Sequence, residues 1–293
     1  MNKKIIGLIL MACLLFAFAA IVYALPPSQT GGVVLSFDDG YQSDFDYGYP
    51  LMLERDMKGC FNIITIKPIE DWTMNWDTLR LLQADGNEIV SHTYDHPDFG
   101  TLTEEEIRFQ CSQSRIMLEE QGLQVNNFVY SSGTGSQAVD DIVLEYYDSG
   151  RYGWGTMSWT YTGWRILGFS SYADTDAQDF ENYKTMIDRV RDEGSWTVLY
   201  FHDVNPGNPN GQSITPEAFE QVLDYIIEQG VQVFTMNEAL AISRGEPTPT
   251  LTPSGEMTAE EWTNFWDWLK TRQQETSWSN YLDQMLEQWQ NTR

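Results

Sequence analysis

From Gly31 onward the chain alternates short β-rich runs with segments of helical periodicity, and this alternation constrains the fold more than any other feature of the sequence. Such alternation favours parallel strands that are joined by crossover helices. We therefore expect an α/β protein, a (β/α) barrel that is distorted and has fewer than eight strands. The expected strands are Val33 to Phe37, Cys60 to Ile66, Glu88 to Ser91, Asn127 to Tyr130, Thr197 to Phe201 and Val231 to Thr235.

Two of the intervening helices carry clear start signals. Thr103 and Glu106 have the spacing of a capping box, which predicts a helix that runs to about Glu120. Thr215-Pro216 opens another helix, which ends at Gly230. Both helices follow expected strands, in agreement with a crossover fold.

The amino-terminal segment resembles an export signal. Lys3-Lys4 precedes an apolar run over residues 5–25, and small residues near Ala24 suit a signal peptidase. We expect residues 1–24 to be cleaved, which predicts a secreted or cell-surface protein. The alternative is an uncleaved membrane anchor through residues 5–25.

The carboxyl-terminal segment differs in composition from the rest of the chain. The main globular domain is expected over residues 25–245, followed by a Pro/Thr-rich linker over residues 246–257. Residues 258–293 have the aromatic spacing of a small amphipathic helical appendage, with Trp262 and Trp289 near its ends. Such a stripe more often packs against a neighbour than binds a ligand.

Charge and cysteine content narrow the functional classes. The formal net charge is −26, with 43 acidic residues against 17 Lys and Arg, so we expect no nucleic-acid partner. Cys60 and Cys111 could form a disulfide in an exported protein, but their apolar surroundings favour two separate buried thiols.

The residues that can carry chemistry follow the expected strands. All three histidines do so: His92 and His96 follow one strand and His202 another, and Asp38-Asp39 follows the first. Because the carboxyl ends of barrel strands share one face, these groups can converge although they are far apart in sequence.

The two histidines of His92-Thr93-Tyr94-Asp95-His96 are spaced to grip one cation together with a carboxylate, leaving a coordination position open. Zn²⁺ is favoured by ligand type, and Co²⁺ or another transition metal is an alternative. Asp38 and Asp39 point in different directions at a strand end, so one can bind the metal while the other handles protons. The competing interpretations are an ordinary exposed histidine pair, an Asp-Asp-Gly turn and a packed His202.

Three motifs in order resemble the polysaccharide deacetylase family, carbohydrate esterase family four, over about Gly31 to Leu240. They are Ser36-Phe37-Asp38-Asp39-Gly40, His92-Thr93-Tyr94-Asp95-His96 and Leu199-Tyr200-Phe201-His202-Asp203. The resemblance implies a catalytic domain over residues 25–245 and one divalent metal ion. It also implies that the metal ligands are Asp39, His92 and His96, the general base Asp38 and the general acid His202.

The chain departs from the family at the arginine that orients the base aspartate. Val129 stands where that arginine would be, and serines replace the Pro-aromatic pair that follows. Arg151 and Arg165 are two candidates to replace it.

Four residues are further candidates for oxyanion or substrate binding. They are Tyr130, Ser132 through its backbone amide, Trp159 and Trp164. The two tryptophans could stack on sugar rings, although packing is the commoner use of such residues. The Asp-Trp motif that orients the acid histidine in the family has no recognisable counterpart in this region.

Together these features predict a metal-dependent hydrolase that removes N-acetyl groups from an N-acetylglucosamine-containing polysaccharide at the cell surface. Two alternatives stay open. One is a catalytically impaired polysaccharide-binding module of the same fold, and the other is a deacylase of small amides or O-acetyl esters.

Overall fold

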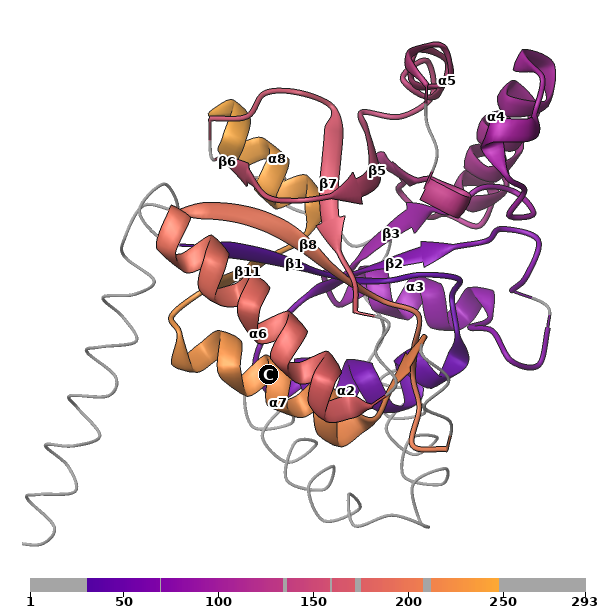
Figure 1. Cartoon of the computed structure of the whole chain (residues 1–293). Coiled ribbons are helices and arrows are strands. Elements are labelled where there is room, and N and C mark those ends of the chain that lie inside the picture. Colours follow the sequence, from indigo (N-terminus) through magenta and orange to yellow (C-terminus); the bar gives the residue numbers. More distant parts are fainter. Residues whose placement is uncertain are drawn as a thin grey trace, which may run out of the picture.

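The computed structural model describes residues 31–68, 70–133, 136–158, 160–171, 175–207 and 212–247. Within them, seven parallel strands close into a ring because β1 pairs with β2 on one side and with β8 on the other. This confirms the expected (β/α) barrel with fewer than eight strands (Figure 1). In order around the ring the strands are β1 (Gly32–Phe37), β2 (Gly59–Ile63), β3 (Glu88–Ser91), β4 (Asn127–Val129), β5 (Ser149–Trp154), β7 (Arg165–Phe169) and β8 (Ser195–Phe201).

Four short strands lie beside this ring. β11 (Gln232–Phe234) runs parallel to the first half of β1, and β6 (Met157–Ser158) pairs antiparallel with the start of β8. β9 (Asp203–Val204) and β10 (Ser213–Ile214) form a separate pair directly after β8. The last pair therefore borders the carboxyl end of the barrel.

Helices surround the barrel wall. They are α2 (Tyr49–Leu53), α3 (Trp76–Ala84), α4 (Glu104–Glu120), α5 (Gln137–Val143), α6 (Asp176–Glu193), α7 (Pro216–Glu228) and α8 (Met236–Arg244), with single turns η2 (Asp44–Gly48), η3 (Phe99–Thr101) and η4 (Ser131–Gly133). The predicted capping box of Thr103 and Glu106 is present at the start of α4. α6 and α7 pack side by side, whereas α4 and α5 lie together elsewhere on the wall (Figure 1).

Two apolar clusters follow from the alternation of side chains along each strand. One fills the barrel interior and includes Val34, Val129 and Trp196 together with residues of α8. The other fills the space between the wall and the helices. Cys60 belongs to the inner cluster and Cys111 to the outer one, and both thiols are free and buried. The structure therefore has no disulfide between them.

The expected terminal segments are not part of the described structure. The leader over residues 1–24, the linker from residue 248 and the helical appendage over residues 258–293 lie outside the described residues. Among the residues that are described, no helix has the length and apolar character needed to cross a membrane.

Candidate functional site

Three potential metal ligands converge at the carboxyl end of the barrel. Asp39 follows β1, and His92 and His96 follow β3; one ligand atom from each lies within 4.8 Å of the others. Asp39 Oδ1 is 3.4 Å from His92 Nε2 and 3.5 Å from His96 Nε2. Asp39 and His96 adopt the left-handed backbone region, with φ of 71° and 65°. Non-glycine residues seldom adopt this conformation without a local constraint, and such constraints gather at functional sites.

The ring of His92 is held by the neighbouring strand. Its Nδ1 is 2.9 Å from the carbonyl oxygen of Val129 on β4, and the side chain is buried. A carbonyl only accepts hydrogen bonds, so this contact assigns the proton to Nδ1 and leaves the lone pair of Nε2 toward Asp39. This is the tautomer in which an imidazole binds a metal through Nε2.

These residues fit a divalent cation. Asp39 Oδ1 is buried, and the two Nε2 atoms approach it without making a hydrogen bond of normal geometry. Burial would raise the pKa of Asp39, but the contact with His92 outweighs it and lowers the pKa, so the carboxylate is ionised. One carboxylate and two imidazoles form the donor set of many hydrolytic zinc sites.

Asp38, the residue before Asp39, faces different partners. Arg151 Nη2 lies 2.5 Å from Oδ1 and 2.6 Å from Oδ2 of Asp38, and Asn62 Nδ2 donates to Oδ1 at 2.6 Å. Burial would raise the pKa of Asp38, but the Arg151 guanidinium, together with His92 and His202, holds it well below its usual value. Asp38 is therefore a buried, ionised carboxylate.

The structure resolves the choice between the two candidate arginines. Arg151 lies on β5, is only 4% exposed, and pairs in register with Val129 of β4. Its guanidinium carbon lies 4.1 Å from the centre of the Tyr200 ring. Arg165 instead forms an ion pair with the buried Asp140 of α5, with a separation of 2.7 Å. Arg151 is thus the arginine at Asp38.

His202 follows β8 and joins the same group. Its Nε2 is 3.9 Å from Asp38 Oδ2, and its side chain is 16% exposed. The segment after His202 is anchored to the turn after β1: Asp44 Oδ1 accepts the backbone N–H of Val204 at 2.9 Å, and Ser43 donates to Asp203. The predicted base and acid therefore lie together, beside the three potential ligands.

Two of the additional substrate-binding candidates, Tyr130 and Trp164, lie away from this group. The Tyr130 side chain is buried, and its hydroxyl donates to Asp140 at 2.9 Å, so it is engaged on the outer side of the wall. Trp164 precedes β7 and therefore lies at the amino end of the parallel strands, opposite the carboxyl end that carries Asp39. Ser132 is exposed in η4 with φ of 60°, and Trp159 lies outside the described residues.

An aromatic pair beside the site was not anticipated from the sequence. The Tyr41 and Trp72 rings lie 5.1 Å apart, and Trp72 is 41% exposed. Gln42 N–H donates to Trp72 O at 2.9 Å, which fastens this loop to the chain just after Asp39. Burial and the nearby Asp39 charge raise the pKa of Tyr41 to about 12. The feature of the sequence that could have indicated this pair is the position of Tyr41, two residues after Asp39.

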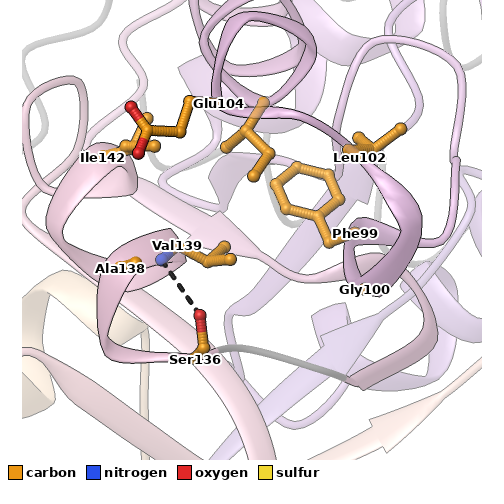
Figure 2. A pocket seen from close by; sticks show the side chains of 9 residues that line it. Phe99, Gly100, Leu102, Glu104, Ser136, Ala138, Val139 and Ile142 are labelled. Atoms are coloured by element: carbon orange, nitrogen blue, oxygen red, sulfur yellow. Dashed lines mark hydrogen bonds between the residues drawn. The ribbon is translucent and has the colours of Figure 1, made fainter.

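A hollow lies between the loop after His96 and α5 (Figure 2). It has a volume of about 440 Å³, and its lining is largely apolar. None of the residues that line it belongs to the Asp38 and Asp39 group. Its lining residues are Phe99, Gly100, Leu102, Glu104, Ile107, Ser136, Ala138, Val139 and Ile142.

Comparison with known proteins gives three findings. Residues 27–147 match the model of a family described as polysaccharide deacetylase. A stretch of 127 residues is 31% identical to gellan lyase from a Bacillus species, covering 42% of this chain and 5% of that protein. A stretch of 81 residues is 32% identical to chitin deacetylase from Colletotrichum lindemuthianum, covering 26% of this chain and 31% of that protein. Each match thus spans less than a third of the relative's length.

A solved structure extends the likeness to most of the barrel. It is a family 4 acetyl xylan esterase from Clostridium thermocellum in complex with a cobalt ion, 20% identical with a TM-score of 0.53. The match covers 77% of this chain and 96% of that one. At this identity the likeness concerns the fold.

Proposed function

We propose that this chain, whose residues 27–147 match the polysaccharide deacetylase family, is a metal-dependent hydrolase that removes N-acetyl groups from an N-acetylglucosamine-containing polysaccharide. We further propose that it acts at or outside the cell surface, as the leader-like residues 1–24 suggest. The observation that carries the catalytic proposal is that two adjacent carboxylates contact different groups. Asp39 faces two imidazoles, whereas Asp38 faces Arg151 and Asn62.

Asp39, His92 and His96 would hold the cation. A bound divalent ion, which we propose to be Zn²⁺ or Co²⁺, would act as a Lewis acid there, polarising the acetyl carbonyl and lowering the pKa of the attacking water. Asp38 would take the proton from that water, because it is ionised and lies next to the ligand Asp39. Its contacts with Arg151 and Asn62 fix the direction of the carboxylate during this transfer.

His202 would give a proton to the departing amine. Its Nε2 lies 3.9 Å from Asp38 Oδ2, so the acid and the base can act on the same substrate group without a change of fold. The backbone N–H of Ser132 is the proposed donor to the oxyanion, since η4 directly follows β4 at the carboxyl end of the barrel.

The Tyr41 and Trp72 pair is the proposed platform for the sugar chain. Aromatic faces provide flat apolar contact, and Trp72 is substantially exposed beside the segment that carries Asp38 and Asp39. One relative is named as a chitin deacetylase, and chitin is a polymer of N-acetylglucosamine, which supports this choice of substrate.

The decisive experiment measures acetate release from N-acetylglucosamine oligomers by the purified protein, first after chelation and then after addition of Zn²⁺ or Co²⁺. We expect release only with metal, and its loss in Asp38→Asn with metal content retained. Asp192→Asn, an exposed charge-matched control on α6, should keep full activity. Metal binding without acetate release would favour a binding module. Release only from acetylated esters or small amides would instead identify a deacylase of that narrower class.

A further inference from the structure

We propose that Gln110 of α4 is a positioning residue for His92 and His96, and that its side-chain amide holds the turn that brings the two imidazoles to one cation. In the proposed function these imidazoles bind a metal ion, and the role of Gln110 rests on that function. Gln110 would act through the backbone of residues 93–96 and would not touch the metal itself.

The turn between the two histidines has an unusual backbone. Thr93 and His96 both lie in the left-handed region, with φ of 70° and 65°. A β-branched residue is an outlier there, and such conformations persist only where the surrounding structure enforces them. The ring of His92 is held by the carbonyl oxygen of Val129, whereas His96 is joined to His92 only through this turn. The shape of the turn therefore sets the position of the second imidazole.

Gln110 makes three contacts with this turn. Its Oε1 accepts the backbone N–H of Tyr94 at 3.0 Å and that of Asp95 at 3.3 Å, and its Nε2 donates to Asp95 Oδ1 at 2.7 Å. Backbone N–H groups only donate, so these partners assign the orientation of the amide. Gln110 is 6% exposed, and the preceding residue, Phe109, packs against the Tyr94 ring at 5.3 Å. One buried amide thus joins the turn to a rigid helix.

The carbonyl groups of the turn are held from another side. The N–H of Thr65 donates to Thr93 O at 3.2 Å, and that of Ile66 donates to Tyr94 O at 3.1 Å. The loop after β2 therefore holds the acceptors of the turn, while Gln110 holds two of its donors. Without Gln110 these donors would have to find other acceptors, which favours a relaxed turn over the strained one.

The test measures the affinity of the full-length protein for Co²⁺ by competition with a chelating dye. We expect Gln110→Met to weaken Co²⁺ binding at least tenfold, because loss of an outer contact that orients a ligand costs about 10–100-fold in metal affinity. Methionine resembles glutamine in helix propensity, so α4 should persist. Gln113→Met, half-buried on the same helix, is the matched control and should bind Co²⁺ as the wild type does.

An exchange of donor and acceptor separates the hydrogen bond from the packing of α4. Gln110→Glu places a second carboxylate opposite Asp95, and we expect it to weaken Co²⁺ binding, although the added negative charge alone would favour a cation. The double variant Asp95→Asn/Gln110→Glu restores a donor and an acceptor with the original net charge. Its Co²⁺ affinity should return to within threefold of the wild type. A residue that only packs α4 would not respond to the side chain at position 95.

The possible outcomes distinguish this role from the proposed function. Equal Co²⁺ affinity in the wild type and in folded Gln110→Met would overturn the role of Gln110. A double variant that binds Co²⁺ no better than Gln110→Glu would do the same, and this near-isosteric pair decides if Gln110→Met does not fold. A wild type that binds Co²⁺ but releases no acetate would refute the deacetylase function alone, because the comparison of affinities does not depend on turnover. A wild type that binds no Co²⁺ would refute the metal site, on which both proposals rest.

Discussion

His92 Nδ1 lies 2.9 Å from the carbonyl oxygen of Val129, so strand β4 sets the orientation of an imidazole carried by β3. The opposite ring nitrogen faces Asp39. Backbone rather than side-chain chemistry thus fixes the tautomer, which makes this orientation independent of the residue type at position 129.

Substitution of His92 and of His202 should separate metal binding from proton transfer. His92→Ala removes one of the three proposed ligands, and we expect metal affinity to fall at least 100-fold together with activity. His202→Ala should retain one metal per chain but lose activity 100-fold or more, because it removes only the proposed proton donor. Metal content after dialysis and acetate release measure the two effects. Equal metal loss in both variants would contradict the division of roles.

Metal removal should also lower stability. A ligand at 100 times its dissociation constant stabilises the native state by about 2.7 kcal/mol, which corresponds to a midpoint shift of roughly 5–10 °C for a domain of this size. We expect this shift when Zn²⁺ is added to the chelated protein. Asp39→Asn should abolish it, whereas Asp192→Asn should not. A shift that persists in Asp39→Asn would place the stabilising ion elsewhere.

The position of the candidate metal site could be predicted because it depends on strand ends. The strands β1, β3 and β8 are rich in Val, Ile, Leu and Phe, and the Asp and His residues follow each directly. Once the strands are parallel, their carboxyl ends share one face, whatever the details of the loops. The convergence of Asp39, His92 and His96 could therefore be predicted from the positions of the strands alone.

Two strands could not be recognised in this way. β5 reads Ser-Gly-Arg-Tyr-Gly-Trp and β7 reads Arg-Ile-Leu-Gly-Phe, so glycines and arginines interrupt the usual β-branched run. Arg151 faces inward because Asp38, 113 residues away, neutralises it. Because β7 could not be recognised in the sequence, the position of Trp164, which precedes it, could not be predicted either. Trp164 lies at the amino end of the barrel and is therefore not part of the site.

A buried carboxyl at the amino end of the barrel should make stability depend on pH. Burial raises the pKa of Glu88 from 4.5 to about 7, against the opposing effect of hydrogen bonds from Asn237 N–H and the Asn127 side chain. Glu238 adds to the rise, and the Cys60 thiol also contacts the carboxyl. The native protein therefore binds this proton more tightly than the unfolded chain does.

The contribution of Glu88 to the free energy of unfolding should therefore fall by an amount on the order of 3 kcal/mol as the pH rises from about 4.5 to about 7. Above pH 7 this contribution should change little. Glu88→Gln removes this contribution, so its stability relative to the wild type should improve between pH 5 and pH 8. Urea unfolding of both proteins at several pH values measures the difference in their free energies of unfolding. Other acids such as Asp44 titrate in both proteins, so their effects cancel in this difference. Parallel curves for the two proteins would show that Glu88 does not titrate in this range.

The exposed ring of Trp72 should contribute to the binding of the polymer rather than to the chemistry. Trp72→Ala is expected to raise KM for long N-acetylglucosamine oligomers about fivefold, which corresponds to about 1 kcal/mol of lost aromatic contact, and to leave kcat within twofold. The effect should be smaller for the shortest oligomer, which cannot reach beyond the Asp38 and Asp39 group. Trp154→Ala is the matched control, since Trp154 is 64% exposed but packs beside Phe169 and Arg189. An equal rise of KM in both variants, or a fall of kcat in Trp72→Ala with unchanged KM, would contradict a sugar platform at Tyr41 and Trp72.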